Sequence, residues 1–264
     1  MHSLDTFLTL RGIYKYYTFS KKFQRYGKEQ IMNYQYNKLK NLLITSYSNI
    51  EYYNSLFNKI NFNPNYDFKS LNDINSIPIL TKEIAKENRE KLINKKYSNK
   101  CLKLRTSGST GEPFEINVSY NAWVVEQAMV WRHWKWAGYV FREKMGILRS
   151  YVPGADAPLI YKDKFRNFFY FSPFHMTDKN MSEFSELIIK EKISVLRGYP
   201  SSLMTFAKFI KNHSYDIPPI KFILTASEVL LDKERNLIED VFNTKIYDHY
   251  GLAEICVMMG ECEE

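Results

Sequence analysis

Residues 107–113, SGSTGEP, form the first stretch of the sequence whose residue types suit a chemical task. Backbone N–H groups around Gly108 and Gly111 can form a concave site for an anion, and the hydroxyls of Ser109 and Thr110 can add donors. The stretch is not a Walker A loop, because its glycines are three positions apart and no lysine follows the second one. From spacing alone, a phosphate-binding loop and a plain surface turn are both open.

Residues 247–255, YDHYGLAEI, are the second such stretch. The ring of Tyr250 can stack on a planar base, and Gly251 lets a ligand approach the backbone closely. The carboxylate of Glu254 can bind a hard cation such as Mg²⁺ through oxygen. The alternative is a strand end that carries a core tyrosine and a solvated glutamate.

The elements that must position these residues follow from the hydrophobic pattern. From Lys144 onward, short apolar runs alternate with amphipathic helical segments, which predicts βαβ units and a mainly parallel sheet. Three polar clusters directly follow predicted strands: RGYPSS at 197–202, TASEVL at 225–230 and DHYGLAE at 248–254. Ligands of open α/β sheets bind beyond the carboxyl ends of the strands. These clusters and the glycine-rich stretch therefore predict a binding site.

A helical region is expected before that sheet. Residues 1 to about 60 place apolar residues at helical spacing, and Thr81 suits the N-cap of a further helix. Residues 100–105 and 114–119 are expected to be the two strands of a hairpin that carries the glycine-rich stretch.

A long helix is expected over residues 121–138, with Asn121 as its N-cap and Gly138 just past its end. Its tryptophans do not share one face of the helix. This favours a core helix with one solvent-exposed side over a surface on which nucleic-acid bases stack. His133, on the same helix, has no partner pattern in the sequence. A later helix is expected with Asp232 as its N-cap.

Composition limits the class of protein. The 264 residues carry a net charge of +8, with a pI near 9.1, but the lysines are interspersed with glutamates, as on a solvated helix face. Three cysteines without a CxxC pair favour a reducing compartment. The apolar runs are too short for a signal peptide or a membrane span. A cytoplasmic protein with no nucleic-acid partner is the expectation.

Taken together, the clusters resemble the adenylate-forming superfamily of acyl-CoA synthetases. TSGSTGEP, TASEVL and YGLAE occur in the order seen in that superfamily, and IYDHYGLAEICVMMGECEE is similar to its phenylacetate–CoA ligase branch with the CapK-like members linked to capsular polysaccharide synthesis. SIPILTKEIAKEN resembles the segment that those proteins carry upstream of the loop. The resemblance covers nearly all of this chain but not the whole length of the family.

The resemblance implies roles for individual residues. The loop that handles the β- and γ-phosphates of ATP matches Ser107, Gly108, Ser109, Thr110 and Gly111. The stretch beside the adenine matches Ala226, Ser227 and Glu228, with Asp248 and His249 next to it. His249 suits a pocket residue and a structural histidine equally well.

The family pattern also implies the adenine-stacking residue and the metal ligand. Tyr250 matches the aromatic residue that stacks on adenine, and Gly251 is its close-packed neighbour. Glu254 matches the acid that coordinates Mg²⁺, and Thr110 and Glu254 are the residues expected to act in catalysis. Residues 199–201 match, less specifically, a segment that lines the acyl pocket.

The resemblance further implies a fold and a reaction. Residues 1–100 are expected to form a helical region, and residues 101–264 one continuous ATP-binding α/β region with a mainly parallel sheet. The expected reaction activates a carboxylic acid with ATP and Mg²⁺ to an acyl-adenylate and transfers the acyl group to a thiol such as CoA.

Two departures from the family pattern affect this expectation. Glu112 stands where the family loop often has a lysine, so the loop would act through backbone and hydroxyl donors. The chain also stops at Glu264, before the ribose-binding aspartate and the adenylation lysine of the family, so it is expected to be an incomplete N-terminal domain without the C-terminal lid. Cys262 by itself cannot build a four-ligand zinc site. The alternative function is a non-catalytic remnant or partner-binding fragment of such an enzyme.

Overall fold

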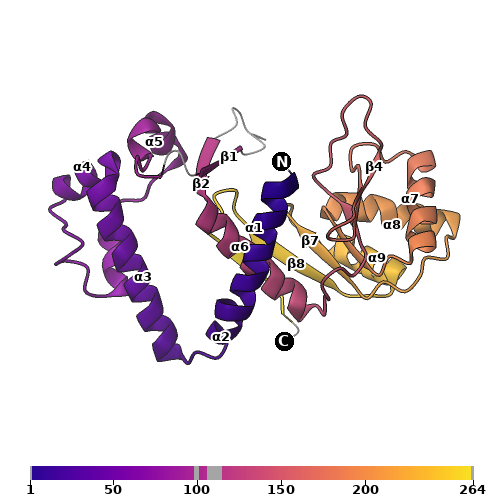
Figure 1. Ribbon diagram of the computed structural model, residues 1–264, viewed down its shortest axis with the longest axis horizontal. Coiled ribbons are helices and arrows are strands. Elements are labelled where there is room, and N and C mark those ends of the chain that lie inside the picture. Colours follow the sequence, from indigo (N-terminus) through magenta and orange to yellow (C-terminus); the bar gives the residue numbers. More distant parts are fainter. Residues whose placement is uncertain (1, 98–100, 106–114, 263–264) are drawn as a thin grey trace. The chain divides into compact units, whose positions relative to one another are not determined.

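The computed structural model describes residues 2–97, 101–105 and 115–262 of the chain. It divides into two compact units, residues 1–128 with 253–255 and residues 129–252 with 256–264, which are treated separately below (Figure 1). The predicted phosphate loop, Ser107 to Gly111, which includes Thr110, lies outside the described residues.

The first unit is mainly helical, as the apolar spacing predicted. Its helices and helical turns are α1 (His2–Lys15), a π-helical turn (Tyr16–Ser20), α2 (Lys21–Phe23), α3 (Lys28–Asn49), α4 (Glu51–Lys59), a 3₁₀ turn (Leu71–Ser76), α5 (Lys82–Glu87) and a second 3₁₀ turn (Glu90–Leu92). Leu43, Phe57, Phe62 and Phe68 form a small buried core. Thr81 caps α5 as expected, because its side chain accepts a hydrogen bond from the Ile84 N–H.

The hairpin around the glycine-rich stretch is confirmed. Strand β1 (Cys101–Arg105) pairs antiparallel with β2 (Glu115–Ser119), with Cys101 opposite Ser119 and Arg105 opposite Glu115.

The long central helix, α6 (Tyr120–Trp136), begins earlier than expected. Asn121 is not its N-cap, because the Ser119 hydroxyl accepts the N–H of Ala122 at 3.2 Å. Ser119 is still in the extended backbone of β2, which an N-cap requires, whereas Asn121 is already helical. The end is as predicted: Gly138 has φ +94°, and the next N–H, of Tyr139, bonds to Trp134 O at 2.8 Å.

Replacing the true cap should therefore cost more than replacing the expected one. We expect Ser119→Ala to lower the free energy of unfolding by about 1 kcal/mol, because one N–H at the start of α6 loses its acceptor. Asn121→Ala, two positions away on an exposed side chain, should change it by less than about 0.5 kcal/mol. Urea unfolding of both variants measures the difference, and a larger loss for Asn121→Ala would contradict the assignment.

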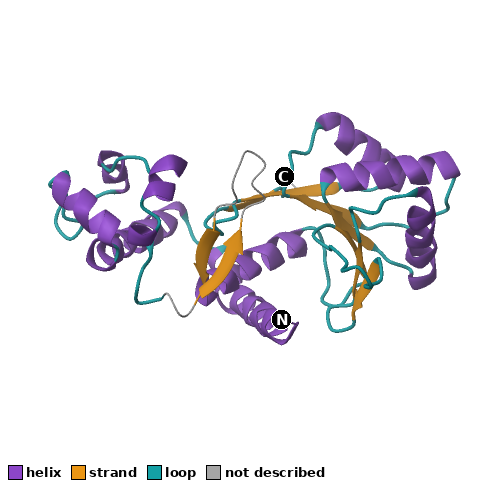
Figure 2. Cartoon of the chain, turned by 90° about the horizontal axis from the view of Figure 1, so that it is seen from above, coloured by secondary structure: helices purple, strands orange, loops and turns teal. Residues whose placement is uncertain are grey.

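The second unit confirms the predicted α/β class. A seven-stranded sheet has the order β4-β5-β3-β6-β7-β8-β9. The helices of this unit pack against the sheet (Figure 2). Its strands are β3 (Met145–Leu148), β4 (Ile160–Asp163), β5 (Phe168–Phe171), β6 (Val195–Gly198), β7 (Phe222–Ala226), β8 (Ile246–Gly251) and β9 (Met258–Gly260). The five central strands are parallel, and β4 and β9 pair antiparallel at the two edges.

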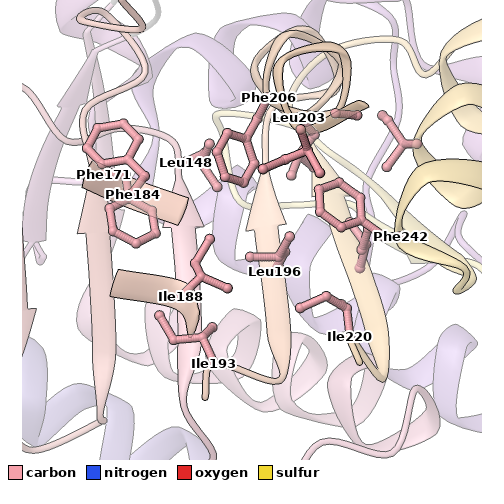
Figure 3. Close-up of a cluster of buried hydrophobic side chains, with 14 of the residues drawn as sticks. Leu148, Phe171, Phe184, Ile188, Ile193, Leu196, Leu203, Phe206, Ile220 and Phe242 are labelled. Atoms are coloured by element: carbon pink, nitrogen blue, oxygen red, sulfur yellow. The ribbon is translucent and has the colours of Figure 1, made fainter. Parts of the chain in front are cut away.

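Three helices cover one face of this sheet and bury its main core. They are α7 (Asp178–Glu191), α8 (Pro200–His213) and α9 (Asp232–Phe242). Figure 3 shows their apolar side chains meeting those of the strands, with Phe171 and Phe184 stacked and Leu196 facing Phe206 and Phe242. Strands β3 and β7 are buried along their whole length, as expected for a parallel sheet.

The expected N-cap of α9 is wrong by one residue. Leu231 has extended backbone and precedes the helix, so Asp232 is its first helical residue. Glu234 receives the Leu231 N–H at 3.1 Å, so a side chain from within the helix closes its first turn.

No helix among the residues that the structure describes is long and apolar enough to cross a membrane.

Candidate functional site

Two of the predicted polar clusters lie side by side at one edge of the sheet. Strands β7 and β8 are parallel neighbours, with Thr225 opposite Asp248 and Ala226 opposite His249. Both strands end there, so Ser227 and Glu228 follow β7 next to the end of β8. The register thus brings together the TASE and DHYG segments, 20 residues apart in the sequence, without any distortion of the sheet.

The residues of β8 divide between the two faces of the sheet. Successive side chains of a strand point to opposite faces, so Asp248 and Tyr250 share one face while His249 and Gly251 share the other. Asp248 accepts a hydrogen bond from the Thr225 hydroxyl at 2.6 Å, which ties the two strands together. The Tyr250 side chain is 53% exposed, so its ring is open to a planar partner.

The backbone after β7 takes an uncommon conformation. Ser227 has φ +75°, and Ser150, the second residue after the end of β3, has φ +56°. Non-glycine residues in the left-handed region cost free energy and are concentrated at functional sites. Both serines are held by partners from other strand ends: Arg149 Nη2 donates to Ser227 Oγ at 3.0 Å, and the hydroxyls of Ser150 and Tyr199 lie 2.9 Å apart.

The third predicted cluster, RGYPSS, joins the same edge. Pro200 begins α8 one residue after β6 ends, with Tyr199 between them, and the Ser201 N–H donates to Glu228 Oε2 at 3.1 Å. The guanidinium of Arg149 lies 5.5 Å from the centroid of the Tyr199 ring. Cross-loop hydrogen bonds therefore connect the carboxyl ends of β3, β6 and β7 into one surface.

Two histidines lie beside this edge, on the face of the sheet opposite Asp248. The rings of His133 and His249 are 6.0 Å apart between centroids. Burial lowers the pKa of His249 to about 4, and the positive charges of Arg197 and Arg149 contribute. Burial likewise lowers the pKa of His133. Both imidazoles are therefore neutral at neutral pH.

Two other parts of the predicted site remain, the glycine-rich stretch and Glu254. Ser107, Gly108, Ser109, Thr110 and Gly111 lie outside the described residues. Glu254 lies in an exposed turn, residues 253–255, that groups with the first unit. Within the described ranges, no three His, Cys, Asp or Glu side chains are grouped so that they could hold a metal ion.

Sequence reasoning missed Arg149, assigned no role to His133, and selected Arg197 only as the first residue of the RGYPSS cluster. Residues 144–151, KMGILRSY, were expected to be one strand, which placed Arg149 inside it; β3 ends at Leu148, so Arg149 follows the strand and the rule on strand ends could not select it. His133 gave no comparable signal, because a helix residue meets β8 only through tertiary packing. Arg197 lies within β6 and not after it, which the cluster did not predict.

Comparison with known proteins relates this geometry to one fold. No family model matches the chain. Two structures of 2-hydroxyisobutyryl-CoA ligase superimpose on it, each at 15% sequence identity. The structure in the thioesterification state with 2-HIB-AMP and CoA has a TM-score of 0.69, and the match covers 90% of this chain and 52% of that chain. The structure in an open conformation with the same ligands has a TM-score of 0.67, and the match covers 86% of this chain and 52% of that chain. The chain has the fold of the adenylate-forming CoA ligases.

A sequence relative agrees with this resemblance. Protein CapK of Staphylococcus aureus is 25% identical over 230 residues, which cover 82% of this chain and 49% of CapK. The chain thus spans about half the length of the curated relative and of the solved ligases that it matches.

Proposed function

We propose that this chain is the nucleotide-binding part of an enzyme that activates a carboxylic acid with ATP and passes the acyl group to a thiol such as CoA. The observation that carries the proposal is the pairing of β7 with β8, which joins the TASE and DHYG segments at the carboxyl edge of the sheet. The fold shared with a CoA ligase and the similarity to CapK support it. In this proposal residues 1–100 are a helical region and residues 101–264 the nucleotide-binding region.

The strand ends would hold the adenosine part of ATP. Tyr250, half exposed at the end of β8, would stack on adenine, and Gly251 would let the base approach the backbone. Ala226, Ser227 and Glu228 would line the other side of the base. Asp248 would keep the two strands in register through its bond to Thr225.

The phosphates and the metal would be held by residues of the glycine-rich stretch and by Glu254. Backbone N–H groups and hydroxyls at Ser107 to Gly111, Thr110 among them, suit the β- and γ-phosphates. Mg²⁺ commonly binds through one or two carboxylates together with substrate phosphates. The exposed carboxylate of Glu254 fits that donor set without a closed protein cage. Bound Mg²⁺ would neutralise phosphate charge.

The reaction needs little covalent work from this chain. The substrate carboxylate attacks the α-phosphorus of ATP, pyrophosphate leaves, and a thiol later displaces AMP. The side chains position the reactants and stabilise charge, and the connected strand ends supply a fixed surface for that task. The protein would act where ATP and CoA are both present, which suits the cytoplasm.

Nucleotide binding to the 264-residue chain tests the proposal. We expect ATP with Mg²⁺ to bind in isothermal titration, and Tyr250→Ala to weaken binding about tenfold, because a stacked base contributes roughly 1–3 kcal/mol. Tyr66→Ala is the matched control, since Tyr66 is 74% exposed and lies in the first unit. Equal loss in both variants, or no ATP binding to the chain and to a version extended to the length of CapK, would refute the proposal.

A further inference from the structure

Helix α1 of the first unit carries apolar side chains on two opposite sides, and one of these sides is buried. Leu8, Gly12 and Tyr16 recur every four residues along the helix and are all buried. At Gly12 the helix meets α6 so closely that an added Cβ would collide with the Cβ of Gln127, which belongs to the same unit (Figure 1). This side of α1 is therefore part of the interior of the first unit.

The opposite side of α1 is an exposed apolar stripe that continues into the π-helical turn. Its four members recur every three or four residues and are between 44% and 71% exposed: Phe7, Leu10, Tyr14 and Tyr17. We call these four residues the α1 stripe. A helix that is apolar on both sides needs a second apolar or interfacial environment for the side that its own fold does not cover. Large exposed apolar side chains in a row mark such a site of interaction.

The segment that carries the α1 stripe is strongly basic. Residues 6–28 contain six basic side chains and no acidic one. The six are Arg11, Lys15, Lys21, Lys22, Arg25 and Lys28, and all except Lys15 are exposed. Within the described ranges, none of the six forms an ion pair with an acidic side chain. The segment therefore presents uncompensated positive charge.

Part of this charge lies directly beside the α1 stripe. The guanidinium of Arg11 is 5.6 Å from the centroid of the Phe7 ring. Lys21 follows Tyr17 by about one turn of the helical backbone. The apolar and the basic groups thus form one continuous surface, which an anionic partner with an apolar interior would match on both counts.

The dimensions and residue types of this surface suit the boundary of a lipid bilayer. α1 has 14 residues, whereas a helix that spans a bilayer needs about 20. A helix with an apolar side flanked by lysine and arginine lies in the plane of the membrane surface. Tyr14 and Tyr17 each combine an apolar ring with a polar hydroxyl, and such side chains are enriched at the level of the lipid headgroups.

We propose that the α1 stripe and the basic residues around it attach this chain to the surface of a membrane that contains anionic lipids. The four side chains of the stripe enter the boundary between headgroups and acyl chains, and the arginines and lysines contact the negatively charged headgroups. α1 lies parallel to the membrane and does not cross it. This inference goes beyond the proposed function and does not depend on it.

An anionic bilayer suits this surface better than a second copy of the chain. In a two-fold symmetric dimer the same patch would face itself, so the basic residues of one copy would lie against those of the other. Like charges placed across an interface are unfavourable. A membrane with anionic lipids instead supplies both an apolar layer and the opposite charge.

Binding to lipid vesicles tests the apolar part of the proposal. We expect the 264-residue chain to sediment with vesicles of mixed phosphatidylcholine and phosphatidylglycerol, and to bind vesicles of phosphatidylcholine alone roughly tenfold more weakly or less. Leu10→Gln should weaken binding to the mixed vesicles roughly tenfold, because one apolar side chain no longer enters the boundary. Glutamine has nearly the helix propensity of leucine, so α1 should persist. Leu42→Gln is the matched control, since Leu42 is 60% exposed on α3 of the same unit, and it should leave binding unchanged.

A charge variant tests the electrostatic part. Arg11→Gln should weaken binding to the mixed vesicles roughly fivefold, in line with the contribution of one basic residue near an anionic surface, and added salt should weaken binding of the unaltered chain. Lys59→Gln removes an exposed charge from α4 of the same unit and should have no effect.

Four results would overturn the proposal. The first is that the unaltered chain does not bind the mixed vesicles. The second is that Leu10→Gln and Leu42→Gln lose binding equally, and the third is a dimer in sedimentation velocity that Leu10→Gln dissociates, which would assign the α1 stripe to a second copy. The fourth is that a version extended to the length of CapK no longer binds the vesicles, which would assign the stripe to the rest of a longer protein.

Discussion

Phe184→Ala is expected to destabilise the second unit by about 3–5 kcal/mol, which is a large part of the stability of an ordinary domain. Phe184 is fully buried on α7, and its ring stacks on that of Phe171 on β5 at a centroid distance of 4.6 Å (Figure 3). Truncation removes the apolar contact and leaves a cavity between helix and sheet that rigid neighbours cannot fill. Loss of the aromatic pair adds to this cost.

Phe174→Ala is the matched control for this substitution. Phe174 belongs to the same unit but is 63% exposed, so its truncation should change the free energy of unfolding by no more than about 0.5 kcal/mol. Urea unfolding, with the slope compared between variants, measures both values. Comparable losses for the two variants would show that the α7 side of the sheet is not the principal core.

The centre of the sheet was predictable because its strands are short apolar runs that alternate with amphipathic helices. Both edge strands were missed, for different reasons. The sequence of β4, IYKD, mixes apolar and charged residues, and β9 has only three residues. Each forms a strand because it pairs antiparallel with a neighbour, β5 or β8, and that pairing is tertiary information.

The two misplaced helix caps have one common cause. Asn121 and Asp232 are good cap residues by type, but a cap is decided by where the backbone leaves the extended conformation. Pairing of β2 with β1 keeps Ser119 extended, and so moves the start of α6. Leu231 has extended backbone and so takes the cap position, although its side chain cannot accept a hydrogen bond. The Glu234 carboxylate, from within the helix, accepts the Leu231 N–H instead.

Part of the candidate site was predictable from one rule, that ligands of α/β sheets bind beyond the carboxyl ends of the parallel strands. Polar residues after parallel strands gather at one edge, and the register of β7 with β8 brings those of TASE and DHYG together. The cross-loop bonds of Arg149, Ser150 and Glu228 did not follow from that rule, because they depend on the conformations of the loops. The contact between His133 and His249 depends on which face of α6 meets the sheet.

The pair formed by buried His133 and partly buried His249 should make the second unit sensitive to acid. Burial lowers the pKa of His249 from 6.5 to about 4, so the unfolded chain binds a proton that the folded chain does not bind between these values. The contribution of His249 is complete above about pH 6.5, falls as the pH is lowered, and is lost near pH 4. At about 1.4 kcal/mol per pH unit, the loss is at most about 3.5 kcal/mol.

His249→Gln isolates this contribution from that of the carboxylates, which also titrate in acid. We expect the stability of the unaltered chain, measured by urea unfolding between pH 7 and 4, to fall more steeply than that of His249→Gln. His175→Gln, which removes an exposed imidazole of the same unit, should keep the steep dependence. If His249→Gln retains the slope of the unaltered chain, the imidazole is protonated in the folded state and hence not enclosed.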